Sequence, residues 1–197
     1  MRKYSGNELR LFLIAVDSYV SKPEKLVIVG GAAIALVGDV NYGTVDIDTW
    51  NSLSRSLESA FVCARTATGL TVPVEHAGVI DPPENFEDRL VQVLPELQKL
   101  SVFVLDPHDV TLSKTVRGLR KDLDAIIRLH TSIPLDLSTL ISRYTGEMSS
   151  VIGNRRAIDQ HFLRLIEILY GEDEAERVRL ILNRDPPLPS VRKHGRF

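Results

Sequence analysis

Two aspartates, Asp46 and Asp48, stand two positions apart in a stretch that reads as a β-strand. Side chains alternate across a strand, so both carboxylates project from one face and Ile47 turns to the other. Neighbouring carboxylates repel each other, and a bound divalent cation allows both to ionise. Mg²⁺ binds proteins through one or two carboxylates together with substrate phosphates. The pair therefore predicts a magnesium site that serves a phosphorylated substrate.

A Gly30-Gly31 pair follows the apolar stretch 26–29 and opens a small-residue helix at 32–37. Glycine at the start of a helix lets backbone N–H groups approach a phosphate, and the helix dipole favours the anion. We therefore expect both glycines to face the phosphates of a nucleoside triphosphate whose Mg²⁺ binds the two aspartates. Taken alone, each signal has a plainer alternative, a tight turn or a chance pair of acids.

A third carboxylate is the natural candidate to take the proton from an attacking hydroxyl group. Residues 71–79 alternate in polarity, and Pro73 favours a strand near an edge of the sheet. Glu75, within this strand, is the best-placed third acid. Asp81, in the turn that follows, competes with it, and a solvent-facing Glu75 without a catalytic role is the other alternative.

Basic side chains gather on a helix that follows the β-prone stretch 100–105. Asp106 and Pro107 predict its start, because aspartate caps a helix and proline fits its first turn. Its basic residues are Lys114, Arg117, Arg120 and Lys121. Helical spacing puts Lys114, Arg117 and Lys121 on one face. We expect this row to bind and neutralise the triphosphate, and a solvated basic face is the alternative.

The composition is that of an ordinary globular protein. The 197 residues are 44% hydrophobic, which is enough for a sizeable core. The net charge is −2, so the chain lacks the overall basic character that marks many nucleic-acid-binding proteins. The single cysteine, Cys63, excludes an intrachain disulfide and a cysteine-rich zinc site, and we expect it to be buried. The sequence shows neither a membrane-spanning stretch nor a signal peptide, which predicts a cytoplasmic protein.

Amphipathic spacing predicts helices before, between and after the candidate site elements. They cover residues 6–20, with Asn7 as the N-cap, and residues 51–64, 135–144, 154–170 and 172–182, with a short turn or helix at 84–90. Basic residues on the later helices are candidates for a local acceptor-binding surface, with ordinary surface charge as the alternative. They are Arg143, Arg155 and Arg156.

The chain divides into three parts on this reading. Residues 1–130 form an α/β core with a leading helix, and residues 131–185 form a C-terminal helical region. A proline-rich run beginning at Asp185 stops helix formation. Residues 186–197 then form a basic, flexible tail.

The glycine pair, a gap of 14 residues and the Asp-Ile-Asp strand together resemble the motif of the nucleotidyltransferase superfamily, whose best-known type is DNA polymerase beta. A second block, Leu-Asp-Pro-His-Asp-Val-x-Leu-x-Lys ending at Lys114, is similar to the AbiEii-like nucleotidyltransferases and their uncharacterised relatives. The resemblance extends over residues 25–130. It implies an α/β (α+β) fold, with a small mixed sheet of the nucleotidyltransferase type flanked by helices and a C-terminal helical extension.

The resemblance also implies a role for each matching residue. It makes Asp46 and Asp48 the metal ligands, Gly30 and Gly31 the phosphate-facing turn, Lys114 a nucleotide-binding or catalytic lysine, and Asp122 a supporting acid, with Asp124 an equally close match. The third carboxylate is the departure from the family pattern, since Glu75 is its best candidate only by position.

The function that the resemblance implies is magnesium-dependent transfer of a nucleotide from a nucleoside triphosphate to an acceptor hydroxyl. The acceptors of such relatives include the 3′ end of tRNA and proteins, and many AbiEii-like relatives are toxins paired with a cognate antitoxin. Two alternatives remain open from the sequence. One is a catalytically inactive nucleotide-binding or interaction module of the same fold, and the other is a metal-assisted phosphoester hydrolase.

Overall fold

The computed structural model describes residues 1–78 and 80–184. Its helices are α1 (Gly6–Tyr19), α2 (Gly30–Val37), α3 (Arg55–Thr68), α4 (Pro107–Arg117), α5 (Arg120–Ser132), α6 (Leu137–Glu147), α7 (Arg155–Tyr170) and α8 (Glu172–Arg184), with a 3₁₀ helix η1 (Phe86–Arg89). Its strands are β1 (Glu24–Val29), β2 (Ile47–Thr49), β3 (Val74–His76), β4 (Val91–Val93) and β5 (Leu100–Val104). The expected α/β class, with helices flanking a small mixed sheet, is confirmed.

The strands form one sheet in the order β3-β2-β1-β5-β4. β1 pairs in parallel with β5 and antiparallel with β2, while β3 joins β2 in parallel and β4 joins β5 antiparallel. Residues 26–29 of β1 are buried, as the continuous apolar run of a central strand requires. The register sets Val29 opposite Asp48 and Asp48 beside Glu75. The end of β1, where α2 begins, therefore lies next to the acidic strand.

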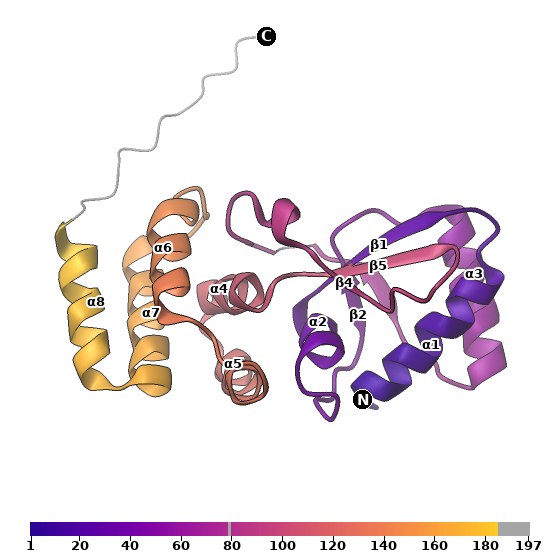
Figure 1. The fold of residues 1–197 in the computed structure, drawn as a ribbon, viewed down its shortest axis with the longest axis horizontal. Coiled ribbons are helices and arrows are strands. Elements are labelled where there is room, and N and C mark those ends of the chain that lie inside the picture. Colours follow the sequence, from indigo (N-terminus) through magenta and orange to yellow (C-terminus); the bar gives the residue numbers. More distant parts are fainter. Residues whose placement is uncertain (79, 185–197) are drawn as a thin grey trace, which may run out of the picture.

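Figure 1 shows an elongated molecule with the sheet towards one end. α1 and α3 pack against each other beside the sheet, whereas α6, α7 and α8 lie at the opposite end. α4 and α5 lie between these two parts. The helix that carries Lys114 thus stands where the sheet and the helical extension meet.

Two hydrophobic clusters form the core, and α4 and α5 contribute to both. α4 places Val110 in the cluster around the sheet and Leu112 in the cluster of the C-terminal helices. α5 does the same with Ala125 and Ile126. Successive positions of a helix point about 100° apart, so a helix buried between two layers can face both. The two clusters are therefore joined through these two helices.

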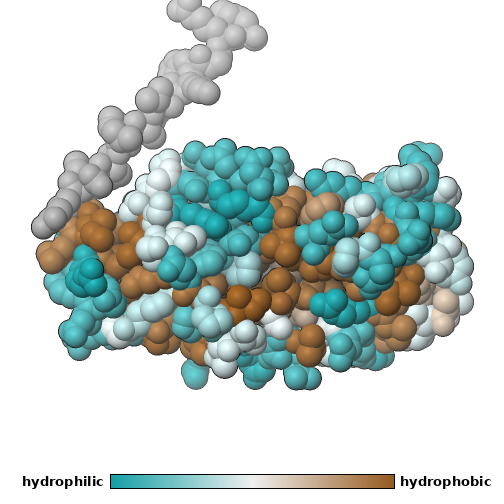
Figure 2. All heavy atoms as spheres, in the orientation of Figure 1, coloured by the Kyte–Doolittle hydropathy of each residue, from teal (hydrophilic) through white to brown (hydrophobic). Residues whose placement is uncertain are grey.

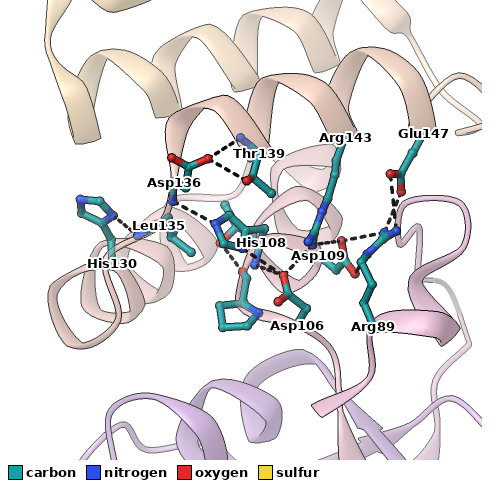
Figure 3. Close-up of polar contacts among 12 residues, drawn as sticks. Arg89, Asp106, His108, Asp109, His130, Leu135, Asp136, Thr139, Arg143 and Glu147 are labelled. Carbon is teal, nitrogen blue, oxygen red and sulfur yellow. Dashed lines mark hydrogen bonds and ion pairs between the residues drawn. The ribbon is translucent and has the colours of Figure 1, made fainter.

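A partly buried ion network at the start of α4 connects it with η1 and α6 (Figure 3). Asp109 is fully buried, and its carboxylate accepts hydrogen bonds from Arg89 Nε at 3.1 Å and from Arg143 Nη1 at 2.8 Å. Arg143 also donates to Asp106 at 2.6 Å, and Arg89 to Glu147 at 2.6 Å. Arg143 therefore stabilises the interior, and its expected place on an acceptor-binding surface is wrong.

The basic helix expected after Asp106 is in fact two helices. Asp106 caps α4 as predicted, but α4 ends at Arg117 because Gly118 adopts φ +61, the left-handed conformation that closes a helix. α5 then begins at Arg120. Lys121 therefore lies on α5, and the expected single row from Lys114 to Lys121 along one helix is wrong.

Several helix ends and side chains differ from the sequence-based expectation. Ser5, not Asn7, caps α1, because Ser5 and Glu8 satisfy each other's backbone N–H groups in a capping box. α3 begins at Arg55, after Ser54 caps it. Cys63 is exposed, because it lies off the buried stripe of α3. β4 was not expected from the sequence.

Hydrophilic side chains gather over η1 on the face shown in Figure 2, where Glu84, Glu87 and Asp88 are exposed. No helix within residues 1–78 and 80–184 is long and apolar enough to cross a membrane. The tail expected at 186–197 lies outside the described residues, as does Val79.

Candidate active site

The carboxylate of Asp48 lies against the first residue of α2. Val29, the residue before Gly30, is the register partner of Asp48 across the β1–β2 pair. Gly30 adopts φ +67, and a Cβ atom there would stand 2.9 Å from Asp48 Oδ2. Any other residue would strain the backbone and displace the carboxylate. Glycine at position 30 is therefore what allows an acid and a helix N-terminus to meet.

The second glycine and the second acid are linked through Thr44. A Cβ atom on Gly31 would stand 2.8 Å from Thr44 Oγ1. The same hydroxyl donates to the backbone oxygen of Asp46 at 3.3 Å and lies 3.5 Å from its Oδ1. Asp46 itself comes one residue before β2 begins. Both predicted glycines and both predicted aspartates are thus brought together at one point of the sheet.

The electrostatics of the acid pair fit a bound cation. Burial raises the pKa of Asp48, and the neighbouring Asp46 raises it further, while Lys114 and Arg117 act against the rise. A divalent cation would relieve this repulsion, and carboxylate and phosphate oxygens are the donors that Mg²⁺ prefers. Within residues 1–78 and 80–184, no three His, Cys, Asp or Glu side chains gather to hold a metal alone. A metal at the acid pair would therefore need further ligands from outside this set of side chains.

Both candidates for the third acid lie close to Asp48. Glu75 is its direct partner across the parallel β2–β3 pair, so the two side chains project from the same face of the sheet. Glu75 is exposed, and its charge adds to the rise in the pKa of Asp48. Asp81 lines a small cavity of about 190 Å³ together with Gly30 and Asp48. The β-register favours Glu75, while the cavity includes Asp81.

Lys114 is buried and tied to Asp122. Its ammonium nitrogen lies 3.1 Å from Asp122 Oδ1, and Arg117 Nη2 lies 2.6 Å from the same oxygen. Burial lowers the pKa of Lys114, and the attraction of Asp122 opposes that shift. Asp122, which the sequence matched equally with Asp124, is the one that is buried, whereas Asp124 is exposed. Asp122 thus positions two of the predicted basic side chains.

A cavity of about 850 Å³, which we call the sheet-side cavity, joins these groups. The lining residues that the sequence analysis predicted for the site are Gly31, Asp46, Asp48, Lys114, Arg117, Lys121 and Asp122. Lys121 reaches it from α5, despite the break at Gly118. The smaller cavity shares Gly31, Asp48, Lys114 and Arg117 with it. The acid pair, the glycine turn and the basic residues therefore surround one space large enough for a nucleotide.

Sequence reasoning missed other residues around the sheet-side cavity. Lys3 and Arg128 add cationic groups, and Tyr42 adds an aromatic ring. Burial, and then the charge of Asp122, raises the pKa of Tyr42, so its hydroxyl stays protonated. Lys3 reaches the site from before α1, and Arg128 from the middle of α5. Nothing in their local sequence marks them, since only the tertiary fold brings them to the acid pair.

Residues 9–174 match the family described as nucleotidyltransferase of unknown function (DUF6036). The chain belongs to this family. The matched region contains the glycine turn, the acid pair, Lys114 and α7, so the expected kinship with the nucleotidyltransferase superfamily is confirmed. No curated protein and no solved structure matches the chain.

Membership in this nucleotidyltransferase family makes a nucleotide the substrate class at a coarse level. The cavity is consistent with that class, because it combines carboxylates for a metal with cations for phosphates. At the same coarse level, the family description places the protein among nucleotidyltransferase enzymes.

Proposed function

We propose that this protein transfers a nucleotide from a nucleoside triphosphate to an acceptor hydroxyl, with Mg²⁺ as its cofactor. The observation that carries the proposal is the contact of Asp48 with Gly30 at the start of α2, in a cavity that Lys114 and Arg117 also line. Acid, helix N-terminus and cations border one cavity, which is the arrangement that a metal-bound triphosphate requires.

Asp46 and Asp48 are the residues that would hold Mg²⁺, which supplies neutralisation of the triphosphate charge when it is bound. The N–H groups at the start of α2 would donate to phosphate oxygens. Lys114 would donate to the phosphates and stabilise the negative charge that develops during transfer. Arg117 would add a second cation beside it. Most of the catalysis would come from positioning and electrostatics.

In the reaction, the acceptor oxygen forms a bond to the α-phosphorus of the triphosphate. The bond between that phosphorus and the bridging oxygen to the β-phosphate breaks, and pyrophosphate leaves. The hydroxyl proton passes to a carboxylate, for which Glu75 is our candidate because it lies beside Asp48 in the β-register.

The biological setting is proposed from resemblance alone. The likeness of the Asp106–Lys114 block to AbiEii-like proteins supports a toxin with a cognate antitoxin, and tRNA and protein are the first acceptors to test. The alternatives are an inactive binding module and a metal-assisted hydrolase, and fold alone does not choose among them.

The test is transfer of label from each α-labelled nucleoside triphosphate to total tRNA and total protein in the presence of Mg²⁺. Asp46→Ala/Asp48→Ala should reduce the rate of label transfer at least about 100-fold. Asp173→Ala, which removes an exposed acid of α8, should keep it. Release of labelled nucleotide without any labelled acceptor would favour the hydrolase, and no metal-dependent reaction at all would favour the binding module.

A further inference from the structure

A second cavity, of about 640 Å³, lies between the α4–α5 turn and α7. We call it the α7 cavity. It shares Lys114 and Asp122 with the sheet-side cavity, so this ion pair forms a common wall between the two spaces. None of the other residues that line the α7 cavity has a role in the proposed triphosphate site.

Two polar atoms at the α7 cavity lack hydrogen-bond partners among the described residues. Asp122 is only 2% exposed, and its Oδ1 accepts from Lys114 and Arg117 while its Oδ2 is buried and unpaired. The second atom is Nδ1 of His161. Buried polar atoms are rarely left unpaired, because desolvation without a replacement hydrogen bond is costly. Since both residues line the α7 cavity, we expect a ligand bound there to offer polar groups to these two atoms.

The absence of a side chain at Gly118 leaves room for the imidazole ring of His161. A Cβ atom at Gly118 would collide with the imidazole ring, and the positive φ of Gly118 also forms the turn between α4 and α5. One glycine therefore both turns the chain and leaves room for the ring beside the α7 cavity.

Cationic and apolar groups, together with the exposed carboxylate of Asp124, complete the walls. Arg120 and Arg164 are exposed at the cavity, and neither forms an ion pair within residues 1–78 and 80–184. Leu119, Leu123 and Leu165 supply apolar surface. Free guanidinium groups fit a phosphate, and apolar walls fit the face of a flat ring.

We propose that the α7 cavity binds a nucleotide unit distinct from the donor triphosphate. Arg120 and Arg164 pair with its phosphate, and the leucine side chains contact its base. Asp122 Oδ2 accepts a hydrogen bond from an amino or hydroxyl group, and His161 Nδ1 makes a further one. The assignment of this unit as the acceptor rests on the proposed function, whereas its binding does not. Its source is either the 3′ end of an RNA strand or a free mononucleotide.

Equilibrium binding of two sets of probes tests the proposal. The probes are the four ribonucleoside 5′-monophosphates and a fluorescent RNA hexanucleotide with a free 3′ hydroxyl, each with the full chain. Arg120→Glu and Arg164→Glu should each weaken binding at least about 10-fold, as expected for loss of a charge-assisted phosphate contact. Arg55→Glu is the control, since Arg55 is an exposed arginine of α3 and lies off the cavity. It should change the affinity less than about 2-fold.

His161→Phe gives a signature that a merely structural role would not produce. A flat aromatic ring, slightly larger than imidazole, is kept while the unpaired nitrogen is removed, so the free protein should melt at the same or a higher temperature. Binding of the nucleotide probes should nevertheless weaken several-fold. A lower melting temperature with unchanged binding would contradict the role of His161.

The same binding measurement distinguishes the two possible sources of the nucleotide unit, and it tests this proposal separately from the proposed function. Binding of the hexanucleotide alone identifies a strand end, and equal binding of a monophosphate identifies a free nucleotide. Binding should persist in Asp46→Ala/Asp48→Ala, so failure of the transfer reaction would leave this proposal standing. It is overturned if no probe binds, if Arg164→Glu binds as well as wild type, or if a nucleoside triphosphate and a monophosphate compete for a single site.

Discussion

The ammonium group of Lys114 lies 3.1 Å from the carboxylate of Asp122, and both side chains are buried. This pair separates the sheet-side cavity from the α7 cavity, and Arg117 contacts the same carboxylate oxygen. The basic groups proposed to bind the triphosphate therefore depend on one acid for their position.

Asp122→Asn should destabilise the protein by about 3 kcal/mol, because removal of one partner leaves a buried charge uncompensated. Burial already lowers the pKa of Lys114, and loss of Asp122 should lower it further. Urea unfolding measures the free energy, with Asp124→Asn, an exposed acid of the same helix, as the control expected within about 0.5 kcal/mol of wild type. Equal stability of the two variants would show that the pair contributes nothing.

Gly30→Ala should cost both stability and triphosphate binding. The new Cβ would meet Asp48 Oδ2 at 2.9 Å and would also strain a backbone at φ +67. Gly69→Ala is a matched control, because Gly69 has φ +68 with nothing within 4 Å of an added Cβ. Both variants should lose about 1 kcal/mol to backbone strain, but only Gly30→Ala should lose triphosphate affinity. If both variants keep the wild-type affinity for the triphosphate, the close approach of Gly30 to Asp48 does not matter for binding.

Glu75→Gln should reduce the rate of transfer by about 100-fold or more, since it removes the candidate base beside Asp48. Asp81→Asn should reduce it only a few-fold, although Asp81 borders the small cavity with Asp48. Transfer rates at saturating triphosphate, measured from pH 5 to pH 9, compare the two. The reverse order of effects would make Asp81 the third acid.

Asp106 should make stability fall in acid. Burial raises its pKa, but hydrogen bonds from His108 and Arg143 outweigh burial and hold the pKa at about 2. In the unfolded chain the pKa of aspartate is about 3.9, so Asp106 contributes about 2 kcal/mol of stability above pH ~4. This stability is lost as pH falls through about 2. Asp106→Asn should therefore be less stable than wild type at pH 5, with the difference shrinking towards pH 2. Urea unfolding at both pH values measures the difference in stability between the two proteins. A difference that stays constant between pH 5 and pH 2 would contradict the assignment.

The centre of the site could be predicted from the sequence because its signals are local. Gly30 directly follows β1, Asp46 directly precedes β2 and Asp48 lies within β2, so the β1–β2 pair brings them together. Asp106 marks the start of α4 by its own chemistry as a cap. Short-range rules of strand alternation and helix capping sufficed for these residues.

The rest depends on contacts between distant positions or on one residue's backbone. Arg89, Asp109 and Arg143 look like surface charges in sequence, yet they meet in the interior across 20 and 34 positions. Periodicity alone extended α4 past Gly118, whose positive φ ends it. His161 reaches Gly118 only because α7 packs on α4. A single sequence does not carry these pairings.

The central claim is that Asp46 and Asp48 bind a metal-bound triphosphate in the sheet-side cavity. Its most direct test is titration of the wild type and of Asp46→Asn/Asp48→Asn with a triphosphate analogue that cannot be cleaved between its α- and β-phosphates, with and without Mg²⁺. We predict that Mg²⁺ tightens binding to the wild type by at least about 10-fold and leaves the variant unchanged. Equal tightening in both proteins, or none in the wild type, would contradict the claim.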